Sequence, residues 1–146
     1  MLEIKPITLY GKHIVLSPPS INDIEGLTRA ARDGETRNNH FSQFPKPNEI
    51  PTYIRKMVEL QKKGVILPFI TIHKDSNMIV GATRYLNIDY DNYRLEIGYT
   101  WIAKSWRKMY VNTEAKYLML RYAFKKLGCR AVEIRTDVFM LFHEEQ

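Results

Sequence analysis

The chain has little cysteine, with Cys129 alone among its 146 residues. A single cysteine excludes an internal disulfide framework and argues against a metal site built from thiolates. Cys129 directly follows a predicted helix end, where a small packed residue is expected rather than a nucleophile. His13, His73 and His143 have no partner at ligand spacing, so we assign no metal to this sequence.

Long apolar runs are also absent. No stretch is long enough to span a bilayer, and the residues after Met1 lack the basic start and apolar run of a signal peptide. No internal repeat, low-complexity tract or linker divides the chain, so residues 1–146 are expected to form one domain. The sequence therefore predicts a compact cytoplasmic protein with no membrane partner.

The charge is moderately basic, because 22 Lys and Arg against 16 Asp and Glu give a formal net charge of +6. The basic residues are scattered and form no long run, which argues against a specific nucleic-acid partner and favours attraction to acidic ligands. A basic module that associates with nucleic acid stays open as an alternative. Binding that weakens steeply with salt would identify it.

Hydrophobic periodicity and turn residues predict the order of helices and strands. The expected elements are a strand at 13–16, a helix capped by Ser20 and Asp23 that runs to about 33, a helix from about 49 to 63, and strands at 65–73, 78–89 and 93–102. The short turns between these strands favour antiparallel hairpins. With a further helix and a parallel last strand, the elements make an α+β layer fold.

The most informative segment is residues 94–128, where a strand, RLEIGYTWI, is followed by a basic loop, AKSWRKMYVNT, and a helix, EAKYLMLRYAFKKLG. Unpaired amides and the dipole at a helix start favour anions, so the segment predicts a site for a cofactor that carries phosphate. Gly98 inside the strand is typical of a bulge or a close backbone approach. An ordinary connection with surface lysines is the alternative.

The helix in this segment has predicted ends and faces. Asn112 and Thr113 are the predicted N-caps, and Gly128 lies where a left-handed C-terminal stop belongs. The expected buried stripe consists of Tyr117, Leu120, Ala123, Phe124 and Leu127.

The same segment resembles a known family. The run EIGYTWI…SWRKMYVNTEAKYLMLRYAFKKLGCRAVEIRTD is similar to the acetyl-CoA-binding segment of GNAT-superfamily N-acetyltransferases of the RimJ/RimL-type branch, most specifically in VNTEAK and AVEIRTD. The likeness extends upstream through GKHIVLSPPSINDIEGL, PFITI and IVGATRYLNID, and so covers the chain to about Asp137. It implies a GNAT-like mixed, mostly antiparallel central sheet flanked by helices.

The resemblance implies acetyl-CoA as the acetyl donor and places it on this segment. Thr100, Trp101 and Ile102 would contact the pantetheine arm in a gap between splayed strands. The pyrophosphate would lie on Arg107, Lys108, Met109, Tyr110, Val111, Asn112 and Thr113. Family members usually have glycine where this chain has Tyr110, and tyrosine disfavours both close approach and positive φ.

The implied reaction is direct acetyl transfer to an amine, with Glu96 as the candidate general base. Strand alternation places Glu96 on the face of Gly98 and Thr100, opposite Tyr99 and Trp101. A solvated or sheet-paired carboxylate is the alternative role. The residues assigned to the acceptor wall are His40, Phe41, Phe44, Arg84 and Tyr85. A loop anchored by two aromatic residues, and a surface charge at Arg84, are the alternatives there.

The C-terminal residues depart from the family pattern. The family continues after IRTD with A-L-N-x-R-S, another helix and two more strands, whereas this chain reads VFMLFHEEQ. We therefore expect a fold that lacks the last helix and strands, and a homodimer through the exposed apolar edge at 138–142, or a tail folded back over that edge.

Three functions follow from the sequence. The first is an N-acetyltransferase that acts on a primary amine of a protein N-terminus or a small molecule. The second is a CoA-binding remnant without turnover. The nucleic-acid-associated module is the third.

Overall fold

The structure is a computed structural model that describes residues 1–33, 44–107, 110–135 and 139–143. Its strands are β1 (Leu9–Tyr10), β2 (Ile14–Ser17), β3 (Leu67–His73), β4 (Met78–Asp89), β5 (Arg94–Ile102), β6 (Ala131–Arg135) and β7 (Phe139–His143). Its α-helices are α1 (Ile24–Arg32), α2 (Ile50–Lys62) and α3 (Val111–Lys125). Short 3-10 turns form η1 (Ile21–Asp23), η2 (Pro47–Glu49) and η3 (Lys104–Trp106).

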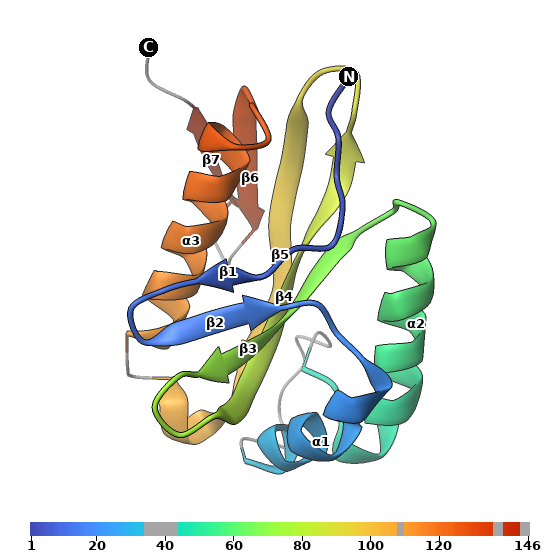
Figure 1. Ribbon diagram of the computed structural model, residues 1–146, viewed down its shortest axis with the longest axis vertical. Coiled ribbons are helices and arrows are strands. Elements are labelled where there is room, and N and C mark those ends of the chain that lie inside the picture. The colour runs from blue at the N-terminus through green and yellow to red at the C-terminus, as the bar shows by residue number, and fades with distance from the viewer. Residues whose placement is uncertain (34–43, 108–109, 136–138, 144–146) are drawn as a thin grey trace.

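The described strands form one sheet of seven, in the order β1-β2-β3-β4-β5-β6-β7 (Figure 1). Neighbouring strands are antiparallel except β5 and β6, which are parallel. Parallel neighbours need a crossover connection, and α3 provides it. The expected α+β fold, with a mostly antiparallel sheet between helices, is confirmed.

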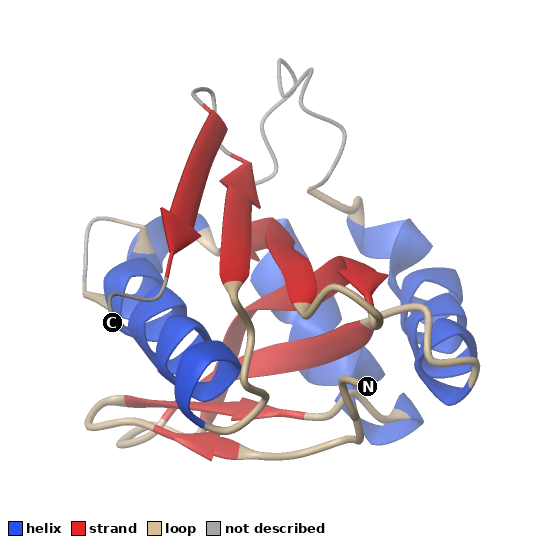
Figure 2. Cartoon of the chain, turned by 90° about the horizontal axis from the view of Figure 1, so that it is seen from above, coloured by secondary structure: helices blue, strands red, loops and turns tan. Residues whose placement is uncertain are grey.

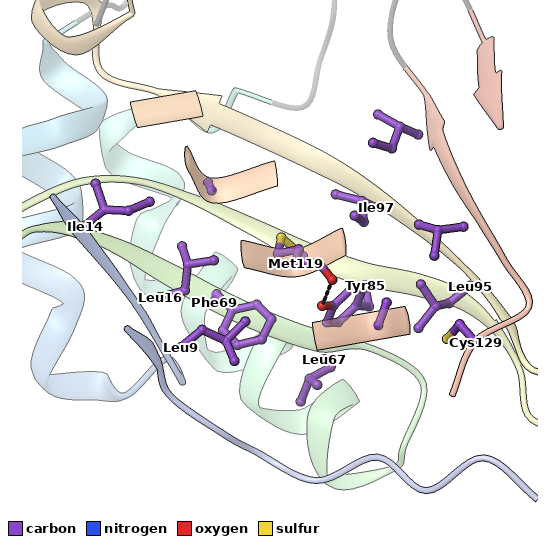
Figure 3. Close-up of a cluster of buried hydrophobic side chains, with 14 of the residues drawn as sticks. Leu9, Ile14, Leu16, Leu67, Phe69, Tyr85, Leu95, Ile97, Met119 and Cys129 are labelled. Carbon is purple, nitrogen blue, oxygen red and sulfur yellow. Dashed lines mark hydrogen bonds between the residues drawn. The ribbon is translucent and has the colours of Figure 1, made fainter. Parts of the chain in front are cut away.

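The helices cover the two faces of the sheet. α3 packs over one face, against β1, β2, β5 and β6, while α1 and α2 pack against β4 and β3 on the other (Figures 1 and 2). Each face buries its own apolar cluster, and Figure 3 shows the cluster under α3. No helix in the described ranges is long and apolar enough to cross a membrane.

Most predicted element boundaries lie within two residues of the observed ones. The predicted capping box is confirmed, because the Asn22 amide donates to the Ser20 hydroxyl and the Ser20 amide donates to the Asp23 carboxylate. The two-residue strand β1 was not predicted.

The predicted start of α3 is wrong, and its predicted buried face is correct in part. The helix begins at Val111 with Tyr110 as its N-cap, so Asn112 and Thr113 lie inside its first turn. Its buried residues are Val111, Ala115, Met119 and Ala123. Of the predicted stripe, Ala123 is buried and Leu120, Phe124 and Leu127 are partly buried against the same cluster, whereas Tyr117 is 59% exposed. Gly128 has a φ of +73°, which confirms the left-handed stop after the helix.

The C-terminal residues fold back onto the sheet. Phe139–His143 form a separate strand, β7, which pairs antiparallel with β6 from Ala131 to Arg135. Of the two expected arrangements of the tail, this backbone pairing matches the one in which the tail covers the sheet edge. The homodimer stays a prediction.

Candidate active site

The site begins where the pairing between β5 and β6 ends. Their parallel pairing runs only from Arg94–Ile97 against 131–134, whereas β5 continues to Ile102. Over 98–102 the backbone of β5 therefore pairs with β4 on one side and has no described ladder partner on the side of β6. An extended ligand can add to such an edge through main-chain hydrogen bonds. The described pairing therefore ends at the place where the resemblance implies a splay.

A bulge in β5 lies at the same point. Ala82 pairs with Trp101 and Arg84 pairs with Gly98, so β5 contains one more residue than β4 between these pairs. Tyr99 takes up the extra length with a φ of +51°, a left-handed conformation that is uncommon for residues other than glycine. The bulge that Gly98 indicated is confirmed, one residue further along.

The bulge changes which residues share a face. Glu96 and Gly98 lie on the α1–α2 face, and Tyr99 and Trp101 follow them there, because each contacts side chains of that layer. Thr100 faces α3 instead, where its hydroxyl lies 2.8 Å from that of Thr83. The predicted alternation of faces, which ignored the extra residue, is wrong beyond Gly98.

The three predicted pantetheine residues, Thr100, Trp101 and Ile102, lie along the open edge. Their side chains are held on either side of the sheet: the Trp101 Nε1 donates to the Tyr53 hydroxyl at 3.2 Å, and its ring lies 4.8 Å from that of Phe44. The main chain of these residues, and not their side chains, therefore lies along the open edge.

The predicted phosphate loop leads into α3. The first hydrogen bond within the helix runs from the Glu114 amide to the Tyr110 carbonyl. The amides of 111–113 therefore have no acceptor within the helix. Arg107 donates from Nε to the Ile102 carbonyl at 2.9 Å, with its guanidinium over the Phe44 ring. The predicted residues Lys108 and Met109 lie outside the described residues. Tyr110, which stands where the family usually has glycine, has a φ of −66°, so this position does not need the positive φ that tyrosine disfavours.

Glu114 fixes the start of α3 to β2. Its Oε2 accepts hydrogen bonds from the amides of His13 at 2.9 Å and Ile14 at 2.7 Å, and its Oε1 lies 3.0 Å from the His13 Nδ1. Burial by itself would raise the pKa of Glu114, but these hydrogen bonds outweigh burial and lower the pKa. A Cβ on Gly11 would come within 2.6 Å of the same Oε2, so glycine is needed there.

A pocket of about 640 Å³ opens on the α1–α2 face. Its lining consists of Pro45, Asn48, Glu49, Thr52, Tyr53, Lys56, Met57, Leu60, Arg84 and Tyr99. Arg84 is buried at 8% exposure, and its guanidinium lies 4.5 Å from the Tyr99 ring centroid and 5.9 Å from that of Tyr53. The predicted acceptor residue Arg84 therefore lies in a pocket next to the bulge.

Other predicted site residues lie in different places. Tyr85 lies under α3, fully buried, and donates from its hydroxyl to the Met119 carbonyl at 2.6 Å (Figure 3). It does not line this pocket, and it lies on the opposite face of the sheet from Arg84 because neighbours on a strand face opposite sides. Phe44 packs against Trp101, while His40 and Phe41 lie outside the described residues.

Glu96 is buried at 4% exposure on the same face as the pocket. Its Oε1 accepts from the Asn87 Nδ2 at 3.0 Å, and its Oε2 lies 3.3 Å from where a Gly98 Cβ would be. The buried position excludes the solvated carboxylate that was one alternative. Within the described ranges, no three His, Cys, Asp or Glu side chains are grouped where they could hold a metal ion.

Sequence reasoning missed the contribution of α2. Tyr53 lies beside Ile50, Ile54 and Met57 on the packed side of the helix, yet its hydroxyl accepts from Trp101 and its ring faces Arg84. A tyrosine within an apolar stripe is the signal that was available, since a buried hydroxyl needs a partner.

Comparisons with known proteins agree with this geometry. A family model described as an acetyltransferase (GNAT) domain matches residues 13–139. A curated relative from Bacillus licheniformis, "Uncharacterized N-acetyltransferase p20", is 25% identical over 131 residues, which are 89% of this chain and 73% of the relative.

Two solved structures have the same fold. A GCN5-related N-acetyltransferase from Brucella melitensis has a TM-score of 0.72 and 22% identity, over 89% of this chain and 60% of that one. The microcin C7 self-immunity acetyltransferase MccE, solved with acetyl-CoA and AMP, has a TM-score of 0.65 and 16% identity, over 85% of this chain and 69% of that one.

Proposed function

The chain belongs to the GNAT acetyltransferase family, and we propose that it transfers acetyl from acetyl-CoA to a primary amine, of a protein N-terminus or a small molecule, that binds beside α2. The family supports acetyl transfer to amines in general. The choice of acceptor and the roles of individual residues are our proposal.

The residues present fit acetyl-CoA. The open backbone edge at 98–102 suits an extended amide-containing arm, and the first turn of α3, near Arg107, suits phosphate. When bound, acetyl-CoA supplies a thioester carbonyl to which the amine adds, so that a C–N bond forms, the C–S bond breaks and the amine gives up a proton. The opening of the edge beside this helix start is the observation that carries the proposal.

The roles of the chain's residues follow from their positions. We assign to Glu96 the removal of the amine proton, directly or through a water, because it is buried on the pocket face two residues before Gly98. Amide N–H groups along 98–102 are the donors available to a carbonyl oxygen that gains negative charge. The RimJ/RimL-type branch is part of the same proposal and rests on the VNTEAK and AVEIRTD runs.

A titration with acetyl-CoA tests cofactor binding. At a hundredfold excess over the dissociation constant, mass action stabilises the fold by about 2.7 kcal/mol. For a chain of this length, that gain raises the melting temperature by about 8 °C. No melting shift at millimolar acetyl-CoA, with no heat in calorimetry, would overturn the proposal.

A variant of Glu96 tests turnover. Glu96→Gln keeps the shape of the side chain and removes its capacity to accept a proton, so the rate of acetyl transfer should fall by about a hundredfold. Binding of acetyl-CoA, measured by calorimetry, should be unchanged. The control is Glu25→Gln, which alters an exposed carboxylate on α1. A rate equal to that of the wild type would assign the proton transfer to another group. Binding without turnover in the wild-type protein would favour the CoA-binding remnant.

A further inference from the structure

Arg84 is a buried cation that lines the pocket and has no ion-pair partner in the part of the chain that the structure describes. Its Nε is buried and has no hydrogen-bond partner among the described residues. Similarly, no salt bridge between described side chains includes Arg84. Burying a charge is costly unless the charge is paired, so the folded protein retains a guanidinium that lacks its usual compensation.

Two tyrosines position the guanidinium without satisfying it. The faces of Tyr99 and Tyr53 attract the cation, but they offer no in-plane acceptor for its N–H groups. The planar fork of donors in an arginine matches a carboxylate through two parallel hydrogen bonds. Two rings therefore hold the guanidinium of Arg84 where it lines the pocket.

The other residues of the pocket lining indicate the charge of a ligand for this pocket and the polarity of the rest of that molecule. Met57 and Leu60 add apolar surface, and Lys56 adds an exposed cation. Glu49, the acidic residue of the lining, is exposed and accepts from the Lys46 amide at 2.8 Å, so it caps η2. This lining favours an anion with an apolar body over a polycation. A volume of about 640 Å³ lies in the range of small-molecule sites.

On the premise of the proposed function, we propose that the acceptor is a small amine that carries a carboxylate, with an apolar amino acid as the simplest case, and that Arg84 binds the carboxylate. Arg84 pairs across the ladder with Gly98, the residue before the bulge at Tyr99. A carboxylate bound there leaves the amine of the same molecule close to the open edge of β5. Arg84 is in this view the residue that determines specificity.

A matched set of probes isolates the carboxylate. Phenylalanine, phenylalaninamide and phenethylamine share the ring and the amine, and differ in having a carboxylate, a neutral amide or neither. Leucine and methionine, each compared with its amide, extend the set to other apolar side chains. The amine of an amide is less basic than that of the free acid, so a larger neutral fraction favours acetylation of the amide. A preference for the acids would therefore run against intrinsic reactivity.

Two readouts separate this inference from the proposed function. Calorimetry with millimolar coenzyme A measures binding of each probe, and release of the free thiol from acetyl-CoA measures turnover. We expect at least one acid to bind and react with an advantage of about tenfold or more over its amide. A tripeptide that begins with phenylalanine tests a protein N-terminus, because it has the amine but carries its carboxylate farther away.

Arg84→Met removes the charge and keeps the apolar stem. The acids should lose their advantage over the amides, while the melting temperature of the unliganded protein should stay the same or rise, since an unpaired buried charge is removed. Arg55→Met makes the same chemical change at an exposed position of α2 and should retain the advantage. A purely structural role for Arg84 would instead lower the melting temperature and leave the preference intact.

Each outcome bears on one claim. Equal binding and turnover of acids, amides and phenethylamine would overturn the carboxylate site and leave the acetyltransferase standing. The same holds if the tripeptide is preferred, or if Arg84→Met retains the preference. Preferential binding of acids without thiol release would overturn the proposed turnover and support the carboxylate site. Absence of binding by every acid would overturn the inference.

Discussion

The contact between Glu114 and β2 gives the sharpest prediction about stability. Glu114→Gln keeps the size of the side chain, and its one oxygen can still accept from the His13 and Ile14 amides, which share Oε2 in the wild type, but the negative charge is lost. The Glu114 side chain is 14% exposed, so water screens that charge poorly. A hydrogen bond to a charged group contributes about 1.5–3 kcal/mol, against about 0.5–1.5 kcal/mol for a neutral one, and for these two bonds together we expect a loss of about 2 kcal/mol.

The pH dependence of this loss has a definite sign. The pKa of Glu114 lies below its ordinary value of 4.5 in the folded protein, because hydrogen bonds from His13 and Ile14 outweigh the opposing effect of burial. The contribution of the charged carboxylate is therefore complete above the unfolded pKa and is lost as the pH falls through the lower folded pKa. The difference between wild type and Glu114→Gln should be fully present at about pH 5 and should shrink below about pH 4.

Thermal unfolding followed by circular dichroism measures this difference. For a chain of this length, a loss of about 2 kcal/mol lowers the melting temperature by about 6 °C. The control is Glu59→Gln, because Glu59 is 64% exposed in its ion pair with Lys63 and such pairs contribute little. A variant that melts within about a degree of the wild type at pH 7, or a difference that grows as the pH falls from about 5 to about 3, would refute the reasoning.

Three further predictions concern other parts of the chain. Tyr85→Phe should destabilise the fold by about 1 kcal/mol in urea unfolding, because it removes the bond to the Met119 carbonyl, yet leave the KM for the acceptor unchanged; an altered KM would contradict its position under α3. Burial raises the pKa of Cys129 to about 11, so iodoacetamide should label it at pH 8 only in denaturant, as mass spectrometry can show. Light scattering should detect a homodimer through the outer edge of β7, and a monodisperse monomer would exclude it.

The regular elements could be predicted because their signals are local. The start and end of β4 match the predicted 78–89, and α2 lies within one residue of its predicted ends at 49 and 63. In both cases a turn or cap residue interrupts a clear apolar period, and both signals lie in the segment itself. The start of α3 was misplaced because Asn112 and Thr113 are good capping residues that the fold does not use as caps.

Strand alternation alone shows that two residues assigned to the same acceptor wall lie on opposite faces of the sheet. Arg84 and Tyr85 are neighbours on β4, so their side chains must face opposite sides of the sheet. The structure places the arginine in the pocket and the tyrosine under α3. Which of the two faces the pocket depends on where α2 and α3 pack, and that is a property of the whole chain.

The bulge in β5 could not be placed from one strand alone, since it is a mismatch of length between β5 and β4. One extra residue at Tyr99 has two consequences. It moves the Tyr99 ring onto the face of Arg84, where the ring helps to hold the guanidinium. It also lies just beyond Ile97, where pairing with β6 ends and the backbone edge is open. Tyr99 therefore belongs both to the lining of the proposed acceptor pocket and to the proposed cofactor edge, and its uncommon backbone conformation lies where these two proposed sites meet.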